Sequence, residues 1–197
     1  AAIAINPKFF VGYMSRGELY MSLGKDHNAL EDYSKVIELS PKIANAYISK
    51  GMIYQRNKRY DEAKEAYLGA IRADANSALA YNNLAWMAAE EGRDLDSALK
   101  WAKKAVELAP KVLDFQDTLG WVYRARKEYE RAAECLIKAL SSESPSANVY
   151  YRLGVVYSEW GKKKESRESL EKALSLAEKT GNAQWEKDAR QLLEKLK

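Results

Sequence analysis

The sequence is poor in the residues that catalytic and metal sites use most. Its 197 residues include one cysteine, Cys135, and one histidine, His27. A lone cysteine excludes an internal disulfide and a zinc site of several thiolates, so we expect Cys135 to be a small buried apolar group. His27 has no second histidine or cysteine to work with and is expected in a solvated turn. Carboxylate pairs such as Glu90-Glu91 are expected at solvated helix ends. We therefore predict no enzyme activity, no metal and no cofactor.

Proline and glycine are also scarce, and no long apolar run is present. Four prolines and ten glycines leave a chain dominated by helix-forming residues, which predicts an all-α fold. No apolar run approaches the roughly 18 to 20 residues needed to cross a bilayer, so membrane insertion is not expected. Lysine and arginine number 32 against 28 acidic residues, without a long block of one sign. This charge balance does not indicate nucleic acid as a partner.

A repeat of 34 residues organises the chain. Gly17 and Gly51 are 34 residues apart, and so are Gly120 and Gly154. The 69 residues from Gly51 to Gly120 equal 34 plus 35, which places one further repeat between them with one inserted residue. Ala85 occupies the glycine position of that repeat. A period of this length is typical of helical hairpins stacked in an array.

Other positions keep the same period. Sixteen residues after each glycine, or seventeen after Ala85, comes the series Tyr33, Tyr67, Ala102, Leu136 and Leu170. Two antiparallel helices approach closely where one carries glycine or alanine and the other a large side chain, so we expect the two series to face each other. Proline ends a helix, and the predicted ends of the second helices are marked by Pro41, Pro110 and Pro145.

These series resemble the tetratricopeptide repeat family over essentially the whole chain. The resemblance implies an all-α fold, an α-α superhelix in which five helix-turn-helix repeats form a right-handed solenoid closed by a C-terminal capping helix. The expected boundaries are residues 1–7 as the tail of a preceding repeat, repeats at 8–41, 42–75, 76–110, 111–145 and 146–179, and the capping helix at 180–197. The chain is thus expected to be the C-terminal part of a longer array. Repeats three and four resemble a tandem pair common in bacterial members, many of them envelope-associated.

In this family the first helix of each repeat lines the concave side, which implies a binding surface there. Positions three before, one after and four after the glycine share one helix face. The surface is expected to be apolar and aromatic, since methionine adapts to varied partners and tryptophan often dominates binding energy. The candidate binding residues are Met14, Glu18, Met21, Ile48, Met52, Gln55, Asn82, Asn83, Trp86, Asp117, Trp121, Arg124, Tyr151 and Arg152.

We therefore predict an interaction scaffold that binds a peptide or partner segment in this groove. A clamp for a chaperone's C-terminal carboxylate is not expected, because Met14, Ile48 and Asn82 stand where that branch of the family has cations. Self-association into a homo-oligomer is an alternative function. RNA binding is disfavoured, because Asp114 and Asp117 in the groove repel phosphates. The structural alternative is that these apolar side chains simply pack against neighbouring repeats.

Overall fold

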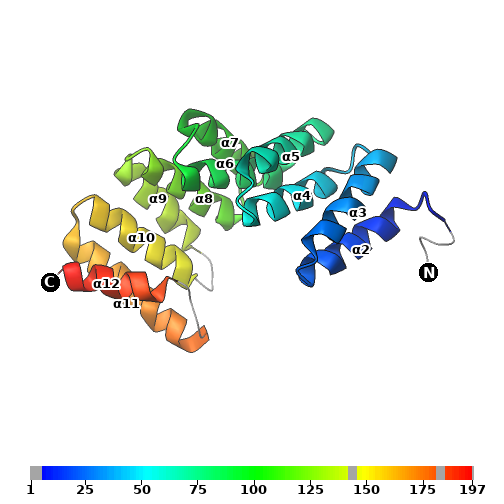
Figure 1. The fold of residues 1–197 in the computed structure, drawn as a ribbon. Helices are drawn as coiled ribbons and strands as arrows, with labels where there is room; N and C mark the ends of the chain where they lie inside the picture. Colours follow the sequence, from blue (N-terminus) through cyan, green and yellow to red (C-terminus); the bar gives the residue numbers. More distant parts are fainter. Residues whose placement is uncertain (1–5, 142–145, 181–184, 197) are drawn as a thin grey trace. The chain divides into compact units, whose positions relative to one another are not determined.

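The computed structural model describes residues 6–141, 146–180 and 185–196, and every regular element in these ranges is an α-helix (Figure 1). The helices are α2 (Phe10–Ser22), α3 (Asp26–Leu39), α4 (Ala44–Arg56), α5 (Tyr60–Ala73), α6 (Ala78–Glu91), α7 (Leu95–Leu108), α8 (Leu113–Ala125), α9 (Tyr129–Ala139), α10 (Ala147–Glu159), α11 (Lys163–Thr180) and α12 (Glu186–Lys195). The predicted all-α fold is confirmed. Residues 1–5 and Pro145, about which the sequence also made predictions, lie outside the described residues.

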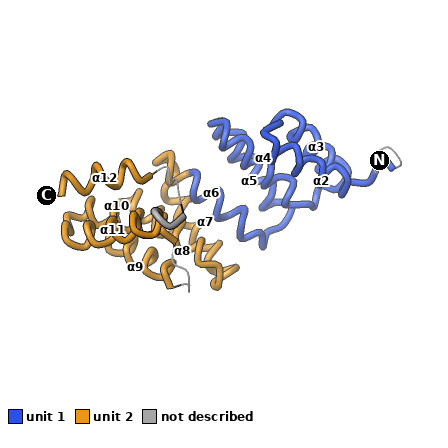
Figure 2. The backbone as a smooth tube through the Cα atoms, turned by 90° about the horizontal axis from the view of Figure 1, so that it is seen from below, with its two compact units in different colours: residues 1–87 blue, residues 88–197 orange. Residues whose placement is uncertain are grey.

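The helices belong to two compact units, residues 1–87 and 88–197 (Figure 2). In the first unit α2 pairs with α3, α4 pairs with α5, and α3 also contacts α4. In the second unit α8 pairs with α9 and α10 with α11, while α7 contacts α8 and α9 contacts α10. Hairpins that pack on the next hairpin are the arrangement that the 34-residue period predicts.

The predicted pairing of small and large side chains is confirmed in four hairpins. A Cβ added at Gly51 would lie 2.5 Å from Cε1 of Tyr67, and one added at Gly154 would lie 2.6 Å from Cγ of Leu170. Both large side chains are fully buried. The same relation joins two further pairs, Gly17 with Tyr33 and Gly120 with Leu136. Glycine is needed at these positions because the facing side chain occupies the space of a methyl group.

The turn between the two helices of each hairpin contains a residue with positive φ at one fixed repeat position. The five residues are Gly24, Lys58, Gly92, Lys127 and Gly161. The inserted residue of the third repeat lies in this turn, since α7 begins ten residues after Ala85 whereas α5 begins nine after Gly51. Asp94 there takes a second positive φ of 52°.

The turn at Lys58 gives a first testable prediction. Lys58 has a φ of 58°, a left-handed conformation that is strained by about 1 kcal/mol in residues with a Cβ. Replacing Lys58 with glycine is expected to raise the free energy of unfolding by about 0.5 to 1 kcal/mol, as measured by urea denaturation. Lys25 supplies the control. It follows the positive-φ residue Gly24 in the turn of the first repeat and has a φ of −86°, so Lys25→Gly relieves no strain. Equal effects of the two substitutions would contradict the argument.

The capping helix predicted at the C-terminus is present as α12 over Glu186–Lys195. Ala189 and Leu196 are buried against Leu170 and Leu174, with Leu192, Leu193 and Trp185 packed around them, so these residues form the apolar face of α12. Arg167 donates a hydrogen bond of 2.9 Å to the carbonyl oxygen of Leu196. The opposite face of α12 carries charged residues, which keeps the end of the array polar.

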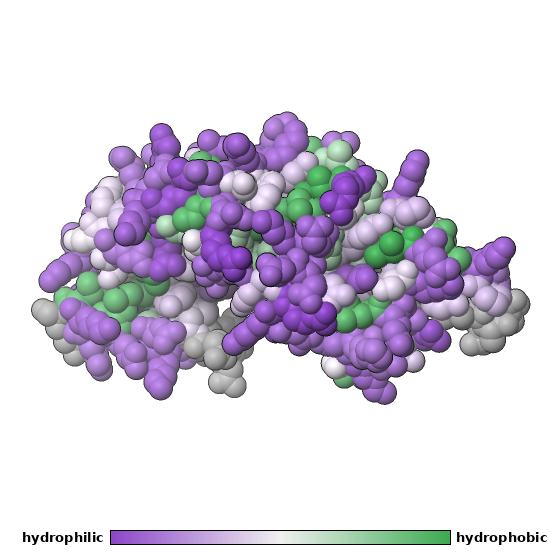
Figure 3. Space-filling view, turned by 45° about the horizontal axis from the view of Figure 1, so that its top comes forward, coloured by the Kyte–Doolittle hydropathy of each residue, from purple (hydrophilic) through white to green (hydrophobic). Residues whose placement is uncertain are grey.

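Apolar side chains at the surface gather in separate patches on the face shown in Figure 3, with polar residues between them. Among the described helices, none combines the length and the hydropathy that crossing a membrane requires.

Candidate functional site

The candidate residues of the first unit divide between the core and the surface. Ile48 is only 4% exposed and belongs to the core, which leaves little of its side chain for a ligand. Met14 and Met21 are partly buried and pack against the core that contains Tyr33 and Val36. Met52 is 46% exposed, and Glu18 is also exposed. The predicted methionine surface therefore reduces to Met52, together with the outer parts of Met14 and Met21.

The amide side chains of the first unit support a buried tyrosine. The Tyr67 hydroxyl donates a hydrogen bond of 2.8 Å to Oε1 of Gln55, and Asn83 also bonds to it. Burial raises the pKa of Tyr67, while the bond to Asn83 lowers it. Oδ1 of Asn82 is buried and has no hydrogen-bond partner among the described residues. Gln55 and Asn83 thus act inside the fold, whereas Asn82 keeps one acceptor for another group. Trp86 is partly buried in the same unit.

The candidate residues of the second unit form one cluster around a tryptophan ring. We define the Trp121 cluster as Asp117, Trp121, Arg124, Arg152 and Glu159. The guanidinium carbons of Arg124 and Arg152 lie 4.3 Å and 5.7 Å from the centroid of the Trp121 ring. Nε of Arg124 is 3.0 Å from Oε2 of Glu159, and Arg152 donates to Oδ2 of Asp117. Cation–π contacts and ion pairs between α8 and α10 hold the cluster together.

Glu90 extends the cluster onto α6, where it accepts a hydrogen bond from Nε1 of Trp121. The sequence placed Glu90 at a solvated helix end and described the groove as mainly apolar. Glu90 is exposed near the C-terminal end of α6, as predicted, and it also bonds to Trp121. The apolar description does not fit this unit, because the candidate positions of α8 and α10 carry paired charges around one aromatic ring. For Glu159 the signal was available in its spacing of 35 residues from Arg124, which is close to the repeat period. The spacing of 31 residues between Glu90 and Trp121 is about one helical turn shorter than the period, so it gave a weaker signal.

Asp117 is the most perturbed acid of the cluster. Asp117 as a residue is only 8% exposed. Burial raises its pKa to about 6, although the charge of Arg152 opposes this shift. The neighbouring carboxylate of Asp114 raises the pKa further. Oδ2 is bound by Arg152, but Oδ1 is buried with no hydrogen-bond partner in the described part of the chain. A buried carboxylate oxygen without a donor is unfavourable for folding, and such groups are frequent at functional sites.

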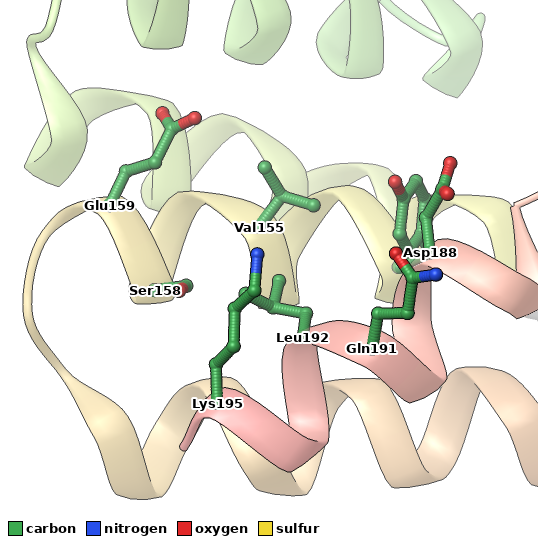
Figure 4. Close-up of a pocket in the computed structure, with 8 residues that line it drawn as sticks. Val155, Ser158, Glu159, Asp188, Gln191, Leu192 and Lys195 are labelled. Atoms are coloured by element: carbon green, nitrogen blue, oxygen red, sulfur yellow. The ribbon is translucent and has the colours of Figure 1, made fainter.

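A pocket of about 290 Å³ lies between α10 and α12 beside this cluster (Figure 4). The Tyr151 ring stacks on Trp185 with centroids 5.0 Å apart, so the predicted binding residue Tyr151 is partly covered by the cap. Asp188 and Gln191 of α12 line the pocket, and Lys195 points from α12 toward α10. The sequence assigned α12 only a capping role, because no repeat register links its polar face to the concave side.

Two residues outside the candidate surface, His27 and Cys135, complete the comparison with the sequence. His27 was expected in a turn, but it lies in the first turn of α3, where its Nε2 is 3.3 Å from Oε1 of Glu31; its side chain is 86% exposed, as expected. Cys135 is 7% exposed, which confirms the predicted buried thiol, and burial raises its pKa. Within the described ranges, acidic, histidine and cysteine side chains form no group of three or more that could hold a metal ion.

The chain matches tetratricopeptide repeat models along most of its length. Models described as tetratricopeptide repeat match residues 48–112, 112–142 and 147–180, and one described as TPR repeat matches residues 17–58. A curated relative, Protein bimA from Emericella nidulans, is 36% identical over 70 residues, which are 36% of this chain and 9% of that protein.

Solved structures share the fold. The structure of YrrB, described as a TPR protein with an unusual peptide-binding site, has a TM-score of 0.69 and 24% identity, with 89% of this chain and 90% of that chain covered. The structure of PilW, a type IV pilus biogenesis factor, has a TM-score of 0.78 and 18% identity, with 94% and 92% covered. At these identities the likeness shows the fold alone.

Proposed function

The chain belongs to the tetratricopeptide repeat family, and we propose that it is a non-catalytic scaffold that binds an extended segment of a partner protein at the Trp121 cluster. The fold supports a role in protein–protein interaction in general. The finer proposal rests on the free acceptor of Asp117, which is buried beside the partly exposed Trp121 ring.

The chemistry of the cluster fits a peptide backbone. Oδ1 of Asp117 needs a donor, and a backbone N–H of an extended partner supplies one with a charge-assisted hydrogen bond once the side chains that cover Oδ1 move aside. Trp121 offers apolar area beside that acceptor, and large aromatic side chains are frequent anchors of protein interfaces. The carboxylates of Asp117, Glu159 and Glu90 surround the ring, which disfavours a phosphate chain as the ligand.

The proposal is tested with peptides selected from a random 12-residue display library against the whole chain. Fluorescence anisotropy of the selected peptides is expected to show about tenfold weaker binding to the Trp121→Ala variant, since truncation of a central aromatic residue commonly has an effect of this size. Trp101→Ala is the matched control, because Trp101 lies on α7, the second helix of its hairpin, and is not one of the residues of the Trp121 cluster. Peptides that bind the Trp121→Ala variant as tightly as the parent chain would refute the proposal.

Self-association is a second candidate, favoured by one observation at α2. Leu19 is 57% exposed, whereas the residues at the same repeat position, Ile53, Met87, Val122 and Val156, are at most 3% exposed. A second apolar side chain, Leu23, is 60% exposed one helical turn further on. If a second copy covers this face, light scattering at about 100 μM protein shows a dimer that Leu19→Glu converts to a monomer. A monomeric parent chain would exclude this candidate.

A further inference from the structure

A second groove lies in the first unit, between α3, α4 and α5. It encloses about 470 Å³, and its lining includes Ile37, Tyr47, Lys50, Tyr54, Glu62 and Glu65. None of these residues belongs to the predicted concave surface. The volume lies within the range of about 300 to 1,000 Å³ that is usual for ligand pockets, and the surface inside is mostly apolar.

The shape of this groove depends on Gly69, a glycine that occurs at its position in one repeat only. The position of Gly69 is occupied by lysine in every other repeat, namely Lys35, Lys104, Lys138 and Lys172. A Cβ added at Gly69 would lie 2.6 Å from Cδ1 of Tyr47, so the ring rests directly on the backbone of α5. With lysine at this position the Tyr47 ring would be forced away from α5. The glycine therefore fixes the ring in one wall of the groove, although glycine weakens a helix interior by about 1 kcal/mol.

An exchanged ion pair makes the same groove acidic. In the second repeat Arg59 pairs with Glu62, with Nη2 2.7 Å from Oε1, whereas the fourth repeat has Glu128 and Arg131 at these two positions. Arg131 lies 5.8 Å from the centroid of the Tyr123 ring. In the second repeat, Tyr54 takes the position of Tyr123. Its ring is covered by Arg59 from the turn, whose guanidinium carbon lies 4.6 Å from the ring centroid. The exchange places the carboxylate of Glu62 on α5 at the repeat position where α9 carries the guanidinium of Arg131.

The charges along the groove are mainly negative. Asp61, Glu62 and Glu65 line it from α5, and Lys50 is the one base among its described lining residues. Nζ of Lys50 donates a 2.9 Å hydrogen bond to Oγ of Ser34. The side chain of Glu65 is 72% exposed, and its Oε2 lies 3.9 Å from Nη2 of Arg72. A basic side chain entering the groove would therefore meet carboxylates beside an apolar floor of Ile37 and two tyrosine rings.

We propose that this groove binds a second partner segment, in which an aromatic or aliphatic side chain is followed by arginine or lysine. The apolar side chain packs on Ile37 and the tyrosine rings, and the basic side chain pairs with Glu62 and Glu65. Glu62 is already paired with Arg59, so Glu65 is the main partner of the added base. This groove shares no residue with the Trp121 cluster, so evidence against one of the two sites does not affect the other.

The test uses two fluorescein-labelled nonapeptides of glycine and serine, one with Phe-Arg and the other with Phe-Glu at its centre. Anisotropy titrations with the whole chain are expected to show at least tenfold tighter binding of the Phe-Arg probe. The proposal is overturned if the two probes bind equally tightly. It is also overturned if neither binds at protein concentrations up to about 1 mM, which is on the order of the weakest specific affinities.

Two variants place the binding in the groove. Glu65→Lys is expected to weaken binding of the Phe-Arg probe about fivefold, and Glu168→Lys, the same change at the same repeat position of the fifth repeat, is expected to leave it unchanged. Gly69→Lys restores the lysine of the other repeats and is expected to abolish binding, with circular dichroism to verify folding. Equal effects of Glu65→Lys and Glu168→Lys overturn the proposal even if Gly69→Lys does not fold.

Discussion

Replacing Asp117 with asparagine is expected to stabilise the protein by about 3 kcal/mol at pH 7.5, although the substitution removes one member of a buried ion pair. Burial raises the pKa of Asp117 from its ordinary value of 3.8 to about 6 in the folded state. At about 1.4 kcal/mol for each unit, the ionised carboxylate is less favourable in the fold than in the unfolded chain by roughly 3 kcal/mol. Asparagine resembles the neutral acid and still accepts a hydrogen bond from Arg152.

The pH dependence of this difference follows from the direction of the shift. Below about pH 4 Asp117 is protonated in both states, so parent and variant have similar stability. Between about pH 4 and pH 6 the unfolded chain loses its proton first, and the parent loses stability relative to the variant. Above about pH 6 the difference is constant. Urea denaturation of both proteins from pH 3.5 to pH 7.5 measures it.

The exposed Glu134 supplies the control for the Asp117→Asn experiment. It lies on the exposed side of α9, so Glu134→Gln is expected to change the unfolding free energy by less than about 0.5 kcal/mol at every pH. A variant at Asp117 that is less stable than the parent at pH 7.5 would show that the pair with Arg152 outweighs the desolvation, and would contradict the argument. A carboxylate that destabilises the fold, but could accept a hydrogen bond from a ligand, agrees with the proposed binding role of Asp117.

Replacing Gly51 with alanine is expected to lower the free energy of unfolding by about 2 kcal/mol. The added Cβ would lie 2.5 Å from Cε1 and 2.7 Å from Cδ1 of Tyr67. This ring cannot retreat easily, because it is fully buried and its hydroxyl is held by Gln55 at 2.8 Å. Overpacking of about 3 kcal/mol therefore outweighs the gain of about 1 kcal/mol that alanine brings to a helix.

A double-mutant cycle separates this steric effect from other effects of alanine. Once Tyr67→Ala has removed the ring, adding Gly51→Ala is expected to stabilise the chain by about 1 kcal/mol, because only the helix propensity remains. The third repeat shows this combination in nature, with Ala85 and Ala102 at the two positions. Ser15→Ala on the exposed side of α2 is the control for helix propensity alone. Additive effects of the two substitutions in the cycle would contradict a direct clash.

The repeat register explains why parts of the candidate site were predictable. The positions three before, one after and four after the glycine placed Asp117, Trp121 and Arg124 on one face of α8, and the structure brings them together with Arg152. The same rule included Ile48, which is buried, because an offset gives the direction of a side chain and not the depth of the helix beneath its neighbours.

The sequence by itself determined the hairpins, their order and the pairs of small and large residues inside them. These features depend on contacts within one repeat, and the 34-residue period displays such contacts several times in one chain. Only the tertiary structure decided how the side chains of different repeats combine. Asp117 and Arg152 are 35 residues apart, and Tyr151 meets Trp185 from a helix outside the repeat register. The burial that raises the pKa of Asp117 and leaves its Oδ1 without a partner depends on several helices at once, which no single repeat encodes.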